Sequence, residues 1–398
     1  MTPTRLAPLL AAIALSALPA HADSWDETLA AARGQTVYFN AWGGDARTNN
    51  FIAWVNEELS AKYGIEVSQV KLSDTAEAVS RVLAEKAAGQ AEGGSVDLIW
   101  INGANFLSMK EQGLLHAPFV ADLPNARFLD LTPGSAAVTD FTIATDGMES
   151  PWRLAKFVLT HDSARVPEPP RTMTDLLEWS TAHPGRFTHP APANFMGATF
   201  LKQALIELAP DASVLQAPPT DASFAEATQP LWAWYDALRP TLWHGGESFP
   251  ENESILQQML GDAEVDFAMA FDPAAAAAAV EQGLLPDTVR SYGLAGGSIG
   301  NVSFVAIPFN AAHAEAAMVV ANFLLDPATQ AHAQDIRVLG SYSVLDPAKL
   351  GPAEQAAFDA LPTSAALPSN ESLGPTLVEP HPEWMTRLVA EWAQRYTQ

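Results

Sequence analysis

The turn Trp42–Asp45, WGGD, combines three groups with which a protein can bind a small molecule. An indole ring stacks on flat or cationic groups, and a carboxylate pairs with a positive charge. The two glycines would let backbone N–H groups approach a ligand closely. The turn follows a short apolar strand, Val37–Ala41, and open α/β sheets bind ligands beyond the carboxyl ends of their strands. An ordinary strand–turn–helix connection would explain the same residues without a ligand.

A second motif has the spacing of a hydrolase nucleophile. The segment Gly296–Gly300 reads GGSIG and matches G-x-S-x-G, with Ser298 at the position of the nucleophile. Such a serine needs a strand before it and a helix after it. Residues Asn301–Ile307 alternate and branch like a strand instead, which favours a glycine-rich crossover. A pair of carboxylates for glycoside hydrolysis stays open, because such pairs form in space and not in sequence.

Metal and thiol chemistry have little support in the sequence. The chain has no cysteine, which excludes disulfides, thiol nucleophiles and cysteine-based metal sites. Its nine histidines are scattered and form no H-E-x-x-H zinc motif. We therefore predict no metal site, no cofactor and no catalytic residues of this kind.

The N-terminus has the pattern of an export signal. Arg5 is followed by the apolar run Leu9–Leu18, and Ala20-His21-Ala22 has small residues at both positions that a signal peptidase reads. The apolar run is too short to span a membrane. We expect cleavage after Ala22 and release into the periplasm of a Gram-negative cell. The formal net charge of −25 argues against nucleic acid and anionic membranes as partners.

The first third of the chain alternates between predicted strands and helices, and a polar turn follows each strand. The first three strands are predicted at Val37–Ala41, Glu66–Leu72 and Val96–Ile101. Strands that alternate with helices form a parallel sheet, so Asp45, Asp74 and Asn102, which follow these strands, are expected at one edge of it. Asp74 also fits a helix cap, because Glu77 comes three residues later. At 398 residues the chain exceeds what one core usually serves, so two domains are expected.

The order of the segments resembles a known family. The segments that carry the resemblance are Val37–Asp45, Val96–Phe106, Pro151–Leu177 and Gly300–Pro327. In this order they are similar to the family 1 extracellular solute-binding proteins of ABC importers, and within that family to the YnjB-type members, near the thiamine, polyamine and iron branch. The iron-binding relatives use adjacent tyrosines, and none of the six tyrosines here are adjacent. The resemblance therefore implies a small polar or cationic solute, for example a thiamine-like one.

The resemblance also implies a fold and partners. The fold would be α/β, the two-lobe periplasmic binding protein fold of type II, with the ligand in a cleft between the lobes. The signal peptide would span residues 1–22, the first lobe 23–149, the second lobe 150–290, a return to the first lobe 291–345, and C-terminal helices 346–398. The protein would be a monomer that delivers its ligand to an ABC permease of the inner membrane.

Carried onto this chain, the family's cleft-facing positions give a predicted ligand site. Its members are Trp42, Gly43, Gly44, Asp45, Asp74, Asn102, Asn105, Trp152, Asn194, Phe195, Phe271, Asp272, Ser298 and Asn301. Trp42, Trp152 and Phe195 would stack on the ligand, and Asp45 and Asp272 would pair with a positive charge. Two members have alternatives: Trp152 could wedge the hinge, and Asp272 could cap the helix that begins near Pro273.

Two other classes of function compete with this interpretation. A secreted periplasmic hydrolase, of the serine or glycoside type, could use the same cleft. A structural protein or chaperone would expose an apolar patch instead of a polar rim. The polar turns that end the early strands argue against the second class.

Overall fold

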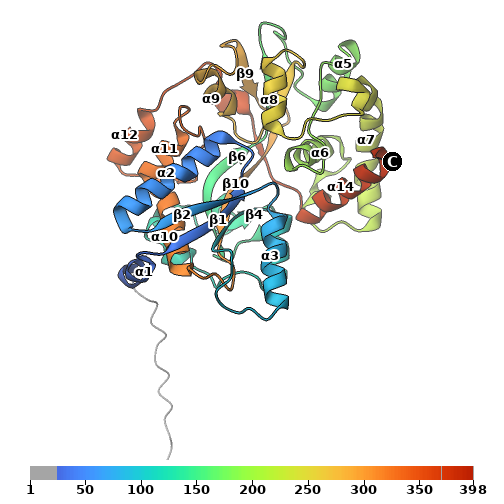
Figure 1. Ribbon diagram of the computed structural model, residues 1–398. Helices are drawn as coiled ribbons and strands as arrows, with labels where there is room; N and C mark the ends of the chain where they lie inside the picture. Colours follow the sequence, from blue (N-terminus) through green and yellow to red (C-terminus); the bar gives the residue numbers. More distant parts are fainter. Residues whose placement is uncertain (1–24, 369, 398) are drawn as a thin grey trace, which may run out of the picture.

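Two large β-sheets, each covered by helices, organise the molecule (Figure 1). A third, small sheet pairs β4 (Thr139–Asp140) with β5 (Ile143–Ala144). The computed structural model describes residues 25–368 and 370–397, so the predicted signal peptide lies outside the described residues. We call the larger of the two large sheets with its helices lobe 1, and the other large sheet with its helices lobe 2. Within the described residues, no helix combines the length and the apolar character that crossing a membrane requires.

Lobe 1 contains a six-stranded sheet with the order β11-β10-β3-β1-β2, in which β6 also pairs with β10. The strands are β1 (Thr36–Trp42), β2 (Glu66–Leu72), β3 (Leu98–Ile101), β6 (Glu149–Lys156), β10 (Ser298–Ala306) and β11 (Thr376–Leu377). β1 is parallel to both β2 and β3, which confirms the predicted parallel start. β10 returns antiparallel to β3 and β6.

The helices of lobe 1 follow from local sequence. α2 (Ala46–Tyr63) buries Phe51, Ile52, Val55 and Leu59 at helical spacing and ends at Gly64, whose φ of 67° is left-handed. The other helices are α1 (Trp25–Ala32), α3 (Ala76–Ala87), α4 (Ala104–Glu111), α10 (Ala314–Leu324), α11 (Pro327–Gln334) and α12 (Pro352–Asp359). A short α13 (Asn370–Leu373) precedes β11.

Lobe 2 is built on a three-stranded antiparallel sheet with the order β8-β7-β9. Its strands are β7 (Val158–Asp162), β8 (Phe267–Ala270) and β9 (Val289–Tyr292). Its helices are α5 (Met173–Ala182), α6 (Phe195–Leu208), α7 (Asp221–Leu238), α8 (Glu253–Gly261), α9 (Ala275–Glu281) and α14 (Pro382–Tyr396). The C-terminal α14 contributes Trp384, Leu388 and Trp392 to the core of lobe 2.

The chain passes between the lobes three times. β6 and β7 are separated by Phe157 alone, so they form one nearly continuous connection. β9 leads to β10 through residues 293–297, where Gly293 is required because an added Cβ would lie 2.2 Å from the carbonyl oxygen of Leu373. The third connection runs from β11 to α14. The predicted boundary between residues 149 and 150 falls at the start of the first connection and stays a prediction.

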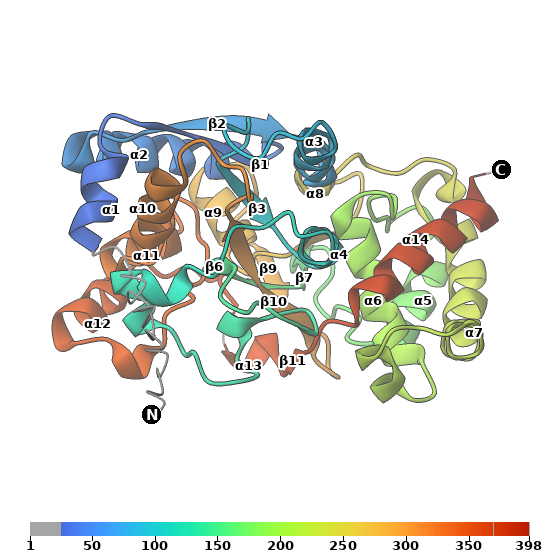
Figure 2. The same cartoon turned by 90° about the horizontal axis from the view of Figure 1, so that it is seen from below.

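The two lobes lie side by side. Figure 2 shows α1, α10, α11 and α12 at one end of the molecule and α5, α6, α7 and α14 at the other. Contacts between the lobes include α4 against α14. The helix that follows β3 therefore touches lobe 2.

Candidate functional site

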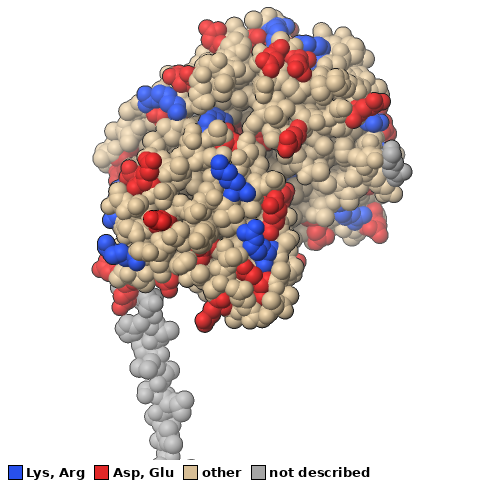
Figure 3. Space-filling view, in the orientation of Figure 1, with Lys and Arg blue, Asp and Glu red and all other residues tan. Residues whose placement is uncertain are grey.

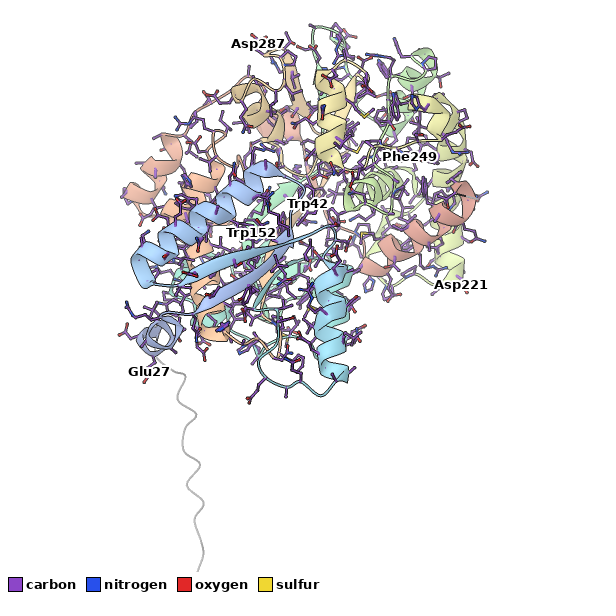
Figure 4. The ribbon with its side chains drawn as sticks, in the orientation of Figure 1. Glu27, Trp42, Trp152, Asp221, Phe249 and Asp287 are labelled. Carbon is purple, nitrogen blue, oxygen red and sulfur yellow. The ribbon has the colours of Figure 1, made fainter. Side chains whose placement is uncertain are left out.

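The turn after β1 lies where the lobes meet. Figure 4 places Trp42 in the middle of the molecule. An added Cβ on Gly44 would lie 2.3 Å from the Trp42 ring, and one on Gly43 would lie 2.7 Å from Cβ of Lys71. Both glycines are therefore explained by close packing of neighbouring side chains. The half-buried Trp42 ring folds back over its own turn.

Asp45 caps the helix that follows the turn. Its carboxylate accepts hydrogen bonds from Thr48 N at 3.0 Å and Thr48 Oγ1 at 2.8 Å, and lies 3.6 Å from Nε of Arg47. Burial would raise the pKa of this carboxyl, but Arg47 and Thr48 together hold the pKa below its ordinary value. Asp45 is therefore ionised and carries its negative charge to the boundary between the lobes.

Two hydrogen bonds connect this turn to lobe 2. Ser254 Oγ, at the start of α8, donates to the carbonyl oxygen of Gly44 at 3.4 Å. Arg47 Nη1 donates to the carbonyl oxygen of Ala275, at the start of α9, at 3.4 Å. The first turns of α8 and α9 are thus held against the first turn of α2.

Arg153 on β6 is the central side chain of this boundary. It donates from Nε to Ser341 Oγ at 3.0 Å and from Nη2 to Asp272 Oδ2 at 3.1 Å. Its guanidinium carbon lies 5.3 Å from the Trp100 ring centre and 5.4 Å from that of Trp152. The guanidinium is therefore fixed to lobe 1 while it pairs with a carboxylate of lobe 2.

Asp272 has the capping role that the sequence offered as an alternative, and it also pairs with an arginine of the protein itself. Its Oδ1 accepts from Ala274 N at 3.1 Å before α9, and its Oδ2 pairs with Arg153. Burial raises the pKa of Asp272, and the nearby Arg153 and Arg47 counter this effect only in part. The positive charge that Asp272 meets is one of the protein's own.

Glu253, the first residue of α8, is a further acid at this boundary that the sequence analysis missed. Burial raises its pKa to about 6, Asp45 adds to the rise, and Arg153 and Arg47 oppose it. We call Asp45, Arg47, Arg153, Glu253 and Asp272 the interlobe charge cluster. Arg153 comes from β6. The other four members lie at or just before the starts of α2, α8 and α9.

Trp152 requires a correction. Its side chain is 1% exposed and packs in the core of lobe 1, 6.2 Å from the Phe51 ring and 5.1 Å from the Trp100 ring. It is the extra residue of a β-bulge, because Ser303 pairs with Arg153 and Phe304 with Pro151. The buried ring cannot stack on a ligand in this structure, and the alternative role in packing beside the hinge fits it.

A second polar group of residues lies where β10 meets α6. Lys202, fully buried, pairs with Glu379 at 2.6 Å, and Asn301 Nδ2 donates to the same carboxylate at 2.9 Å. Nζ of Lys202 lies 4.5 Å from the Phe141 ring centre and 5.3 Å from that of Phe195. Asn301 is thus bound to a protein carboxylate.

The remaining predicted residues differ in how they are placed. Asn102 donates to the carbonyl oxygen of Val302 at 2.5 Å, and Asn105 is half-buried on α4. Asn194 caps α6 by accepting from Met196 N at 2.8 Å. Phe195 is 38% exposed and lies edge-on to Phe271, with ring centres 5.7 Å apart.

Asp74 is an exposed helix cap. Its Oδ1 accepts from Ala76 N at 2.7 Å, while Glu77 Oε1 accepts from Asp74 N at 3.1 Å. This is the capping alternative that the sequence offered, and Asp74 is separate from the interlobe charge cluster.

Ser298 does not have the geometry of a hydrolase nucleophile. It is fully buried, its Oγ accepts from Leu294 N at 3.1 Å, and a strand, β10, follows it where a helix would be needed. The crossover interpretation of Gly296–Gly300 fits this geometry, and Ser298 is withdrawn from the ligand-facing set. Across the described part of the chain, no group of three or more His, Cys, Asp or Glu side chains could hold a metal ion.

Comparison with known proteins assigns the family. The family model for bacterial extracellular solute-binding proteins matches residues 53–358. Protein YnjB of Escherichia coli is 42% identical over 388 residues, which cover 98% of each chain.

Solved structures share the fold at low sequence identity. The TpPotD lipoprotein of Treponema pallidum has a TM-score of 0.66 at 14% identity, over 91% of this chain and 99% of that one. The periplasmic binding protein AfuA of Actinobacillus pleuropneumoniae, with fructose-6-phosphate bound, has a TM-score of 0.62 at 13% identity over the same shares. The chain therefore belongs to the bacterial extracellular solute-binding proteins, the substrate-binding components of ABC importers, and has their two-lobe α/β fold of type II.

Proposed function

We propose that the protein binds a small polar solute with a cationic group between its lobes and delivers it to an ABC permease of the inner membrane. The observation that carries the proposal is the interlobe charge cluster, in which lobe 1 and lobe 2 both contribute carboxylates. A ligand that binds both lobes stabilises the closed state over the open state.

The charge balance of the cluster favours a cation. Two guanidinium groups face three carboxyl groups, so the cluster carries one net negative charge when all five groups are ionised. Burial is the main cause of the raised pKa values of Glu253 and Asp272, and the negative charge of Asp45 adds to both. A bound cation would supply the missing positive charge.

Aromatic surface beside the cluster suits the same kind of ligand. Trp42 is half-buried and adjoins the turn that carries Asp45. An indole face attracts cationic groups by about 0.5–2 kcal/mol, depending on how far the pair is desolvated. By contrast, charged side chains are scattered over the outer surface in Figure 3, so the proposal rests on the cluster and not on surface charge.

Relatives with this fold bind unlike solutes, so the fold does not decide the ligand. The AfuA structure holds fructose-6-phosphate and the HitA structure of Pseudomonas aeruginosa holds iron. A relative from Listeria monocytogenes is described as a spermidine/putrescine transporter. We extend from the family to this chain a periplasmic location after cleavage at Ala22, binding without turnover, and a monomeric state.

The test is ligand capture by the mature protein, residues 23–398. Native mass spectrometry after gentle periplasmic purification detects a bound solute, and fragmentation identifies it. Melting-temperature shifts with thiamine, polyamines, sugars and amino acids follow. We expect cationic compounds to raise the melting temperature of the wild type, and Asp272→Asn with Glu253→Gln to abolish that shift. The exposed cap variant Asp74→Asn is the matched control and should keep it. Binding restricted to uncharged compounds would contradict the proposal.

A further inference from the structure

The guanidinium of Arg153 has hydrogen-bonding capacity that the protein does not use. A guanidinium has five N–H donors. Within the described residues, Arg153 donates one to Ser341 and one to Asp272, which leaves three without a protein partner. The side chain as a whole is 11% exposed, so the protein does not enclose it completely.

The same guanidinium is rigidly placed. Ser341 fixes its Nε edge, and the rings of Trp100 and Trp152 lie within 5.4 Å of its central carbon. Fixed donors bind an anionic oxygen at a lower entropic cost than mobile ones, and a planar guanidinium matches a carboxylate or phosphate with two parallel bonds. The arrangement of Arg153 is thus that of a preorganised anion receptor.

Neither a simple cation nor a simple anion satisfies the whole cluster. A cation without an acceptor would displace water from the three donors of Arg153 without replacing its hydrogen bonds, which costs free energy. An anion alone would add negative charge beside Asp45, Glu253 and Asp272, whose balance with the two arginines is already negative. A solute with both groups meets both requirements.

We infer that the solute is zwitterionic, with a carboxylate or phosphate that accepts hydrogen bonds from Arg153 and a cationic group that faces Asp272 and Glu253. This inference rests on the proposed function and names the class of solute for the same site. Arg153 is then the residue that selects solutes with an anionic group.

The first experiment separates the inference from the proposed function. Metabolites of a periplasmic extract are divided by ion exchange into pools that carry only cationic groups, only anionic groups, both, or neither. Each pool is added to the mature protein, residues 23–398, and the melting temperature is recorded. The pool with both groups should raise it. A rise with the cation-only pool alone overturns the inference and leaves the proposed function standing. A rise with only the other two pools, or none at all, contradicts both.

The second experiment tests Arg153 itself. The active compound is compared with its derivative in which the anionic group is esterified or removed. Wild type should prefer the intact compound at least tenfold, Arg153→Met should bind both equally, and Arg153→Lys should be intermediate because it keeps the charge and loses the planar fork. Arg337→Met, which removes an exposed arginine paired with Asp335, is the control and should behave as wild type. Equal losses for both compounds in the Arg153 variants would indicate a purely structural role and overturn the inference.

Discussion

Nη2 of Arg153 lies 3.1 Å from Oδ2 of Asp272, although the arginine belongs to a strand of lobe 1 and the aspartate to a turn of lobe 2. Both side chains are about one-tenth exposed. The pair therefore joins the two lobes, and it links the electrostatics of the binding region to their relative position.

Asp272→Asn should shift the protein towards an open conformation. The change removes the charge that meets Arg153 and leaves the arginine without its partner from lobe 2, so the closed state should lose about 1–3 kcal/mol. Small-angle X-ray scattering should show a larger radius of gyration than for wild type. Asp335→Asn removes a carboxylate that pairs with Arg337 inside lobe 1, and should leave the radius unchanged. Equal radii of gyration for the wild type and both variants would contradict this prediction.

Trp152→Ala should mainly lower stability, whereas Trp42→Ala should mainly lower ligand affinity. Trp152 is buried among Phe51 and Trp100, so its truncation should cost about 3–5 kcal/mol of unfolding free energy. Trp42 is half-buried at the boundary between the lobes, so its truncation should lower ligand affinity more than stability. Chemical denaturation and ligand titration of both variants give the comparison. A stable Trp152→Ala protein that had lost binding would return Trp152 to the site.

Ligand affinity should fall below pH 6. Glu253 has a pKa raised to about 6 by burial, so it loses its negative charge as the pH falls through that value. A cationic group then meets one carboxylate fewer, and affinity should drop by about tenfold, the factor that one pKa unit of coupling gives. Titrations from pH 7.5 to pH 5 measure the effect. Glu253→Gln should bind the ligand weakly at every pH and should show no fall in affinity near pH 6. An unchanged fall in that variant would show that another group causes the pH dependence.

Stability should fall as the pH rises from about 6.5 to about 8, a range in which histidines are mostly uncharged in both the folded and the unfolded state. Burial raises the pKa of Asp140 from 3.8 to about 8 and raises that of Glu149 well above its ordinary value, with each carboxyl fully enclosed. The folded state therefore holds protons that the unfolded state has lost, and this stabilisation disappears through the folded pKa. Glu149→Gln should raise the melting temperature at pH 8 and change little at pH 4. Glu111→Gln, an exposed change on α4, is the control. A melting temperature that rises with pH in this range would refute the assignment.

Lys202→Met should destabilise the protein strongly. It leaves the buried carboxylate of Glu379 without the ammonium group 2.6 Å away, and breaking such a pair costs about 3–5 kcal/mol. The double variant Lys202→Met/Glu379→Gln should recover part of the loss, because no isolated charge remains. Denaturant unfolding of the wild type, both single variants and the double variant decides this. Additive effects of the two changes would show that the pair is not coupled.

The sequence predicted the parallel start of lobe 1 because strand periodicity and turn residues are local properties. β2 has the predicted bounds, and β1 extends the predicted strand by one residue at each end. The overall fold came from the resemblance, and the family comparison confirms it. Trp42 and Asp272 were placed at the boundary between the lobes by their positions at strand ends.

The sequence placed Trp152 at the boundary between the lobes, but Arg153 lies there and Trp152 lies in the core. This difference could not be predicted from strand positions. Alternation along a strand assigns neighbouring residues to opposite faces, but the bulge at Trp152 interrupts the register between β6 and β10. Glu253 was missed for a different reason: it begins a helix far along the chain, and only the packing of α8 against the β1–α2 turn brings it to the cluster.

The three connections between the lobes also govern when the protein can fold. Lobe 1 lacks a central strand until residues 298–306 have been made, and the core of lobe 2 lacks Trp384, Leu388 and Trp392 until synthesis is almost complete. An emerging chain therefore cannot finish either core early. Both lobes therefore reach their native packing only after nearly the whole chain has been synthesised.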